Sequence, residues 1–286
     1  MKSKWLALLE ILLVYVLMQA ISIALRPIGI DQWQRENLGW SYTGMFIFVG
    51  IPAFVIWLTR RDWAAYGASL ADWQTNLDIG IKAYLVRLIP YVIGVGGAAW
   101  LTLDANKISG GAFIALMEII GVGVMIWVMN HQKPVRFGRG TVIVTIVLLL
   151  FPVGVAFAMN RLSVIIVSTV MWQFVFSGFG EEFVWRGYVQ SRLNQAFGRP
   201  MRLFGIQFGA GLIIASLLFG LLHAFNTYDP AVGFASLTWG SALASAMAGL
   251  MFGVIREKTG TLLASGIAHG LPDAVGEALG KIFGWM

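Results

Sequence analysis

The chain has 286 residues, of which 58% are hydrophobic and only 12% are charged, and its mean hydropathy is +0.77. Soluble domains carry about 25% charged residues, so this chain has half the charge that a water-facing surface needs. The composition therefore excludes a soluble protein, and it excludes intrinsic disorder, which requires low hydrophobicity. We expect an all-α polytopic membrane protein.

The sequence contains no cysteine, which excludes disulfides, thiolate metal sites and cysteine nucleophiles. Its 20 Lys and Arg residues outnumber 14 Asp and Glu residues, giving a net charge of +6. In a membrane protein such a surplus marks cytoplasmic loops and their contacts with anionic headgroups. The partner that the charge balance indicates is therefore the lipid bilayer, with no nucleic acid.

Apolar segments of the length that a spanning helix needs, about 20 residues, follow one another along the chain. Eight of them are predicted to be complete spans: 5–25, 39–58, 79–103, 110–129, 141–159, 162–178, 203–225 and 234–255. A ninth segment begins at Thr261, and it is shorter and interrupted by Pro272. The expected fold is a bundle of about eight transmembrane helices plus a Pro-broken C-terminal helix.

The first segment resembles a signal peptide in its flanking residues, but its apolar run is longer than a signal core of about 7–15 residues. It also contains Glu10. A retained first helix is therefore the favoured interpretation, with a cleaved signal peptide as the alternative.

Basic residues are distributed unequally between the loops on the two sides of the predicted bundle. If the N-terminus is cytoplasmic, the inside loops hold Lys2, Lys4, Arg60, Arg61, Lys133, Arg136, Arg139, Arg192, Arg199, Arg202, Arg256 and Lys258. The outside loops then hold only Arg26, Arg35, Lys107 and Arg161. This positive-inside bias predicts an integral multi-pass protein of the plasma (inner) membrane with a cytoplasmic N-terminus.

The segment between the second and third spans has an apolar stripe with helical period, formed by Trp63, Tyr66, Leu70, Trp73 and Leu77. Two tryptophans and a tyrosine on one face are typical of a helix that lies at the membrane interface. The pattern predicts an interfacial amphipathic helix near 62–78, with an ordinary connector as the alternative.

Ionisable side chains at membrane depth are costly, so each is a functional candidate. Glu182 and Arg186 are four residues apart, share a helix face and can pair. Glu181 is rotated away from them and is free to face a cavity. One acid held by an arginine beside a second, unpaired acid is an arrangement that supports general base catalysis. A structural ion pair at a helix end is the alternative.

Two histidines add to this pattern. His223 on an apolar helix is either a packing residue or part of a site, and His269 shares a face with Asp273. If the sixth helix continues through Glu181 to about residue 197 and the seventh begins near Arg202, then Glu181 and His223 have comparable depth. His269 is shallower than His223 by roughly 15 Å, a difference that helix tilt and uncertain helix ends can absorb. The three patterns can therefore share one cavity, which is expected to open toward the cytoplasm.

The remaining charges inside the predicted spans are given structural roles. Glu10 and Glu118 have no charged neighbour in the sequence and are predicted to have a structural or snorkelling role. Lys82 and Arg87 lie near the cytoplasmic end of their predicted span, where long side chains can reach the headgroups.

Three ordered motifs resemble the motif set of the CPBP family: Glu181-Glu182-x-x-x-Arg186, Phe219-x-x-x-His223 and His269-x-x-x-Asp273. This family comprises the type II CAAX prenyl endopeptidases and the related ABI-like bacteriocin-processing or bacteriocin-immunity proteins. The resemblance covers about 178–273 and departs at Asp273, where the prenyl endopeptidases carry Asn. It divides the chain into N-terminal transmembrane helices at 1–160, including the interfacial helix, and a CPBP-like catalytic helical core at 161–286.

The resemblance implies an intramembrane endopeptidase that hydrolyses a peptide bond of a membrane-associated or prenylated (CAAX-like) protein or peptide with glutamate- and histidine-activated water. It implies that Glu181 is the general base, assisted by Glu182, which Arg186 holds in place. Two alternatives stay open: a non-catalytic bacteriocin-immunity or binding membrane protein, and a transporter that uses these residues as a proton relay.

The same resemblance implies that His223 and His269 polarise the scissile carbonyl or support a metal, and that Asp273 completes the pocket. A divalent metal such as zinc would be held by Glu181, His223 and His269. These residue types suit zinc, but their spacing is not that of the His-Glu-x-x-His helix of soluble zinc proteases. A glutamate mechanism without metal is slightly favoured over the metal mechanism.

Overall fold

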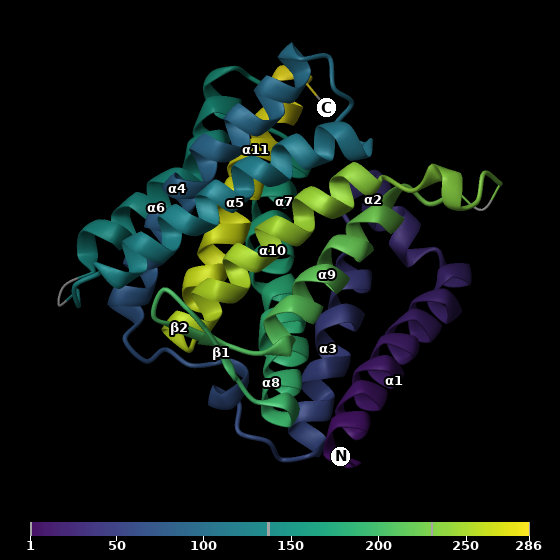
Figure 1. Ribbon diagram of the computed structural model, residues 1–286. Coiled ribbons are helices and arrows are strands. Elements are labelled where there is room, and N and C mark those ends of the chain that lie inside the picture. Colours follow the sequence, from purple (N-terminus) through teal and green to yellow (C-terminus); the bar gives the residue numbers. More distant parts are fainter. Residues whose placement is uncertain (1, 136–137, 230, 286) are drawn as a thin grey trace.

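The computed structural model describes residues 2–135, 138–229 and 231–285 and is 79% helical, which confirms an all-α polytopic membrane protein (Figure 1). The α-helices are α1 (Lys2–Leu25), α2 (Ile30–Leu38), α3 (Tyr42–Leu58), α4 (Trp73–Trp100), α5 (Ile108–Asn130), α6 (Arg139–Ala158), α7 (Val164–Met171), α8 (Ser191–Phe197), α9 (Ala210–Ala224), α10 (Trp239–Thr259) and α11 (Leu263–Phe283). Two π-helical segments, η3 (Trp172–Glu181) and η4 (Phe183–Gln190), join α7 to α8. Short 3₁₀ turns are η1 (Arg26–Ile28), η2 (Ala64–Tyr66), η5 (Phe225–Thr227) and η6 (Phe234–Ser236).

Within the described residues, six helices are long and apolar enough to cross a membrane, and α2 with α3, bent by 120°, would make a seventh. The sequence predicted about eight. The difference lies mainly at α9, which has 15 residues and begins at Ala210. The chain before it forms a hairpin of β1 (Met201–Leu203) and β2 (Ile206–Phe208), so the predicted start of this helix near Arg202 is wrong.

The C-terminal helix is continuous, which corrects the prediction that Pro272 breaks it. α11 runs from Leu263 to Phe283 with Pro272 inside it. Proline removes one backbone hydrogen bond from a helix. Here the surrounding bundle supports the helix, since Leu271 before Pro272 and Ala274 after it are completely buried.

The interfacial helix predicted near 62–78 is not formed. Within residues 62–72 the helical structure is limited to the single turn η2, and Gly67 ends that turn with a φ of +86°. α4 then begins at Trp73 and continues into the membrane span. Tyr66 is buried inside the bundle, so part of the apolar stripe packs against protein instead of lipid.

The centre of the bundle is made by α9, α10, α11 and the η3–η4 segment (Figure 1). α10 packs against α9 and α5, and α11 packs against η3 and α4. The outer helices α1 and α6 expose many large apolar side chains, including Leu9 and Leu150. Such a surface is expected where helices face lipid tails.

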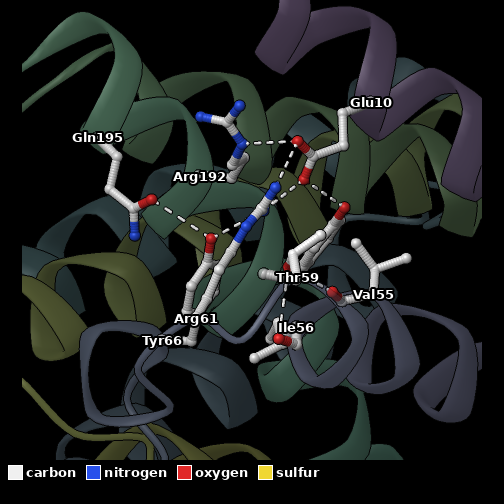
Figure 2. A network of polar contacts seen from close by, with 9 residues as sticks. Glu10, Val55, Ile56, Thr59, Arg61, Tyr66, Arg192 and Gln195 are labelled. Atoms are coloured by element: carbon white, nitrogen blue, oxygen red, sulfur yellow. Dashed lines mark hydrogen bonds and ion pairs between the residues drawn. The ribbon is translucent and has the colours of Figure 1, made fainter.

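Glu10 is the centre of an ion-pair network that attaches α1 to the bundle (Figure 2). Its carboxylate oxygens lie 2.6 and 2.9 Å from the guanidinium of Arg61 and 2.9 Å from Nε of Arg192. The Tyr188 hydroxyl donates to it at 2.8 Å. The carboxylate also raises the pKa of Arg61, which lies outside the spans, above its ordinary value. Glu10 therefore has the structural role predicted for it.

Candidate active site

A close helix crossing brings the first and third motifs together. Gly178 of η3 lies directly on Gly270 of α11, because a Cβ atom on Gly178 would be only 2.5 Å from the Gly270 Cα atom. The same Cβ atom would be 3.0 Å from the carbonyl oxygen of Gly266. Small residues at such a crossing allow two helix backbones to approach closely in a membrane. The crossing places Glu182 of one helix against His269 of the other.

Glu182 lies between a buried arginine and a histidine. Its Oε1 atom is 3.0 Å from NH1 of Arg186 and 3.1 Å from Nδ1 of His269. Arg186 is also completely buried, and its NH2 group donates to the Gly249 carbonyl at 3.0 Å. The predicted pairing of Glu182 with Arg186 is therefore confirmed. Glu182 has a second contact that its position in the sequence did not indicate, because it also orients His269.

The imidazole of His269 lies between two carboxylates. While Nδ1 contacts Glu182, Nε2 lies 3.5 Å from Oδ2 of Asp273, which is a looser contact. Phe252 of α10 stacks on the ring with centroids 4.7 Å apart and an interplanar angle of 15°. These contacts hold both the orientation of the ring and the positions of its nitrogens.

The second motif lies beside the third. His223 is in the last turn of α9, and its Nδ1 is 2.8 Å from the carbonyl oxygen of Phe219. Since a carbonyl can only accept, Nδ1 carries a proton, and in the neutral imidazole Nε2 is then the acceptor. The ring of Phe219 lies between the two histidines, 4.5 Å from His223 and 5.6 Å from His269 by centroids.

Glu181 ends η3, next to Glu182 in the chain. Its Oε2 atom is buried and has no hydrogen-bond partner among the described residues. It is close enough to His223 and His269 to interact electrostatically with both. Measured from the end of α8 and the start of α9, Glu181 and His223 differ in depth by only about 5 Å. The expected equal depth therefore holds despite the wrong helix start.

A cavity of about 340 Å³ lies among α4, α5, α9, α10 and α11. Its wall includes three of the predicted site residues, His223, His269 and Asp273. Glu181, Glu182 and Arg186 are not among the residues that line it, but Glu182 contacts His269, which is. From the histidines the cavity extends to Ala105 and Asn106 in the α4–α5 connection.

That connection lies at the end of the bundle opposite the basic loops. In Figure 1 the N-terminus is at the bottom with the β1–β2 hairpin, and the C-terminus is at the top. Because α4 begins on the side of the 59–72 loop, the 101–107 connection lies on the other side. With a cytoplasmic N-terminus, the Ala105 and Asn106 end of the cavity would lie on the opposite side of the membrane, whereas the sequence predicts a cavity that opens toward the cytoplasm.

Arg87 is a site residue that the sequence analysis missed. It was expected to reach the headgroups, but its side chain is only 13% exposed and lies in the cavity wall. Its Nε is 3.5 Å from Oε1 of Glu118, and its NH1 is 4.0 Å from Oδ1 of Asp273. The error arose because α4 begins at Trp73, so Arg87 lies about 21 Å along the helix. Glu118, an isolated acid at membrane depth, was the signal that a cation had to be nearby.

The residues do not fit the metal centre that the resemblance allowed. Within the described part of the chain, no three His, Cys, Asp or Glu side chains gather as a set of metal ligands. Both nitrogens of His269 face carboxylates, and Nδ1 of His223 faces a carbonyl. The set of Glu181, His223 and His269 is therefore not arranged to share one ion.

The fold and the site together define a polytopic membrane protein with a buried, charged and histidine-containing centre. Residues 163–275 match the family model described as Type II CAAX prenyl endopeptidase Rce1-like. This match includes all three motifs and confirms the resemblance to the CPBP family of intramembrane proteases. No curated protein and no solved structure matches the chain. The matched family is one of CAAX prenyl endopeptidases, and the match covers 113 of the 286 residues.

Proposed function

We propose that the protein hydrolyses a peptide bond of a membrane-associated or CAAX-like prenylated protein or peptide, with water activated by Glu181 and without a metal. The observation that carries this proposal is the buried carboxylate oxygen of Glu181, which has no hydrogen-bond partner among the described residues and lies within electrostatic range of two histidines whose rings are held in place. A carboxylate in such a position is suited to general base catalysis.

In the proposed mechanism Glu181 accepts a proton from water, and Nε2 of His223 accepts a hydrogen bond from the same water. The water oxygen attacks the scissile carbonyl carbon. Because Nε2–H of His269 is held only loosely by Asp273, it can also donate to the oxyanion that forms. Glu181 then returns the proton to the leaving amine as the C–N bond breaks.

The substrate and the base are tested together by comparing membrane-associated peptides from cells that produce wild-type protein or Glu181→Gln. We expect a set of cleaved peptides that depends on Glu181, with cleavage lowered by about 10²–10⁴-fold in the variant, as for loss of a general base. Glu36→Gln on the exposed face of α2 is the matched control and is expected to cleave normally. Undiminished cleavage by a well-inserted Glu181→Gln protein would contradict the proposal.

We also propose that the N-terminus lies in the cytoplasm of a plasma membrane, so that substrates enter the cavity from the opposite side. The support is the positive-inside distribution of basic residues together with the position of Ala105 and Asn106 at the far end of the bundle. A substrate would then present a segment that is inserted in the membrane or delivered from outside the cytoplasm.

The natural absence of cysteine makes this orientation directly measurable. A single cysteine at Ala105 is expected to react with a membrane-impermeant maleimide in intact cells. A single cysteine at the exposed Lys133, at the other end of the bundle, is expected to react only after permeabilisation. The reverse pattern would show that the cavity opens to the cytoplasm and that the N-terminus lies outside.

A further inference from the structure

Six ionisable side chains form one continuous row through the centre of the bundle, and groups that can carry opposite charges alternate along it. The row begins on α5, passes through α4 and α11, and ends at Glu182, between η3 and η4, and at Arg186 on η4. Successive charged atoms are 3.5, 4.0, 3.5, 3.1 and 3.0 Å apart in the order Glu118, Arg87, Asp273, His269, Glu182 and Arg186. The family match begins at residue 163 and so includes only the last four of them.

We propose that Arg87, held by Glu118, is a positioning residue of the active site that supplies the counter-charge to Asp273 and keeps its carboxylate in place as the acceptor for Nε2 of His269. For its catalytic consequence this inference rests on the proposed endopeptidase function. The geometry of the row does not depend on that function.

Burial makes the counter-charge necessary. The Asp273 side chain is 31% exposed, and it faces a cavity inside the membrane bundle instead of bulk solvent. A carboxylate in such surroundings is costly unless a cation and hydrogen bonds compensate it. In the described part of the chain, Arg87 and His269 are the two groups within ion-pair distance of Asp273. Since His269 is shared with Glu182, Arg87 supplies the cation that is always charged.

Arg87 is itself held in a defined position. Glu118 is almost completely buried, with a side-chain exposure of 2%, and it faces Nε of Arg87. The guanidinium carbon lies 5.6 Å from the ring centre of Tyr91 and 5.2 Å from that of Phe252. Phe252 is also the ring that stacks on His269. Arg87 is therefore connected to the His269 imidazole by two sets of contacts, one through Asp273 and one through the ring of Phe252.

The test measures whether the effect of removing Arg87 depends on the charge of Asp273. Arg87→Gln is made in the wild-type background and in an Asp273→Asn background, and all four proteins are reconstituted in lipid nanodiscs. Loss of Arg87 leaves a carboxylate without its cation in the first background and an amide that needs none in the second. We expect Arg87→Gln to lower kcat at least tenfold with little change in KM in the first background, and less than threefold in the second.

Thermal unfolding of the same four proteins gives a second measurement that needs no substrate. Arg87→Gln is expected to lower the unfolding temperature, and adding Asp273→Asn is expected to restore part of that loss. Lys82→Gln, which removes a half-exposed cation near the start of the same helix, is the control and should change neither measurement. If Arg87→Gln alone does not accumulate in the membrane, recovery of the double variant supports the inference.

Independent effects of the two substitutions in both measurements would overturn the inference. Failure of the proposed function is a different result. If wild-type protein cleaves nothing, that function is wrong, while the unfolding temperatures still decide whether Arg87 compensates Asp273. If Glu181→Gln abolishes cleavage and Arg87→Gln leaves kcat unchanged, the function stands and the positioning role is refuted.

Discussion

Arg186→Met is expected to destabilise the protein by about 3–5 kcal/mol and to abolish cleavage. Both Arg186 and Glu182 are completely buried, so the substitution leaves the Glu182 carboxylate without its cation. Breaking a buried ion pair by removing one partner has a cost of this size. The Glu182 carboxylate would also move away from Nδ1 of His269, whose orientation it sets. Unfolding in mixed detergent and SDS micelles measures the first effect, and cleavage of the identified peptide measures the second.

The double variant Arg186→Met with Glu182→Gln separates stability from activity. Replacing both charges of a buried pair is often neutral for stability, so most of the lost stability should return. Activity should not return, because the double variant lacks the Glu182 carboxylate that orients His269 through Nδ1. A double variant that is as unstable as Arg186→Met would show that the pair does not account for the loss.

Gly178→Ala is expected to lower activity by about 100-fold and to destabilise the protein by about 1–3 kcal/mol. Its added Cβ atom would lie 2.5 Å from Gly270 Cα and 2.9 Å from Gly270 N, so one helix must move away from the other. Overpacking of this kind has the stated cost in stability. A shift of about 1 Å between Glu182 and His269 is enough for the expected loss of activity.

The control for this prediction is Gly276→Ala on α11, the helix that Gly178 contacts. A Cβ atom at Gly276 meets nothing within 4 Å. Because alanine favours a helix more than glycine does, this variant should be as stable as wild type or slightly more stable. Equal effects of the two substitutions on cleavage would show that the helix crossing does not position the site.

Local patterns in the sequence predicted the parts of the site that lie within one or two helical turns. Glu182 and Arg186 are four residues apart, and the predicted pair is formed because both lie on one continuous helical segment. His269 and Asp273 are also four apart and in contact, since α11 continues through Pro272. The apolar segments predicted most of the spans for the same reason, because hydropathy is a property of neighbouring residues.

Contacts between distant segments were not predictable in this way. Arg87 and Glu118 are 31 residues apart, and Asp273 is more than 150 residues from either, so nothing in the local sequence places them together. The error at Arg87 came from the start of α4, which the sequence placed six residues too late. The hairpin before α9 was missed because two three-residue strands are too short to show a period.

The sequence by itself determined that the chain lies in a membrane, that it is helical, and that acidic and histidine motifs recur in the order of a known family. These follow from composition and short-range spacing, because the bilayer forbids most charge and a helix repeats every 3.6 residues. The tertiary structure decided which charges meet. Helix crossings such as Gly178 on Gly270 depend on the packing of whole helices, and they create the row from Glu118 to Arg186.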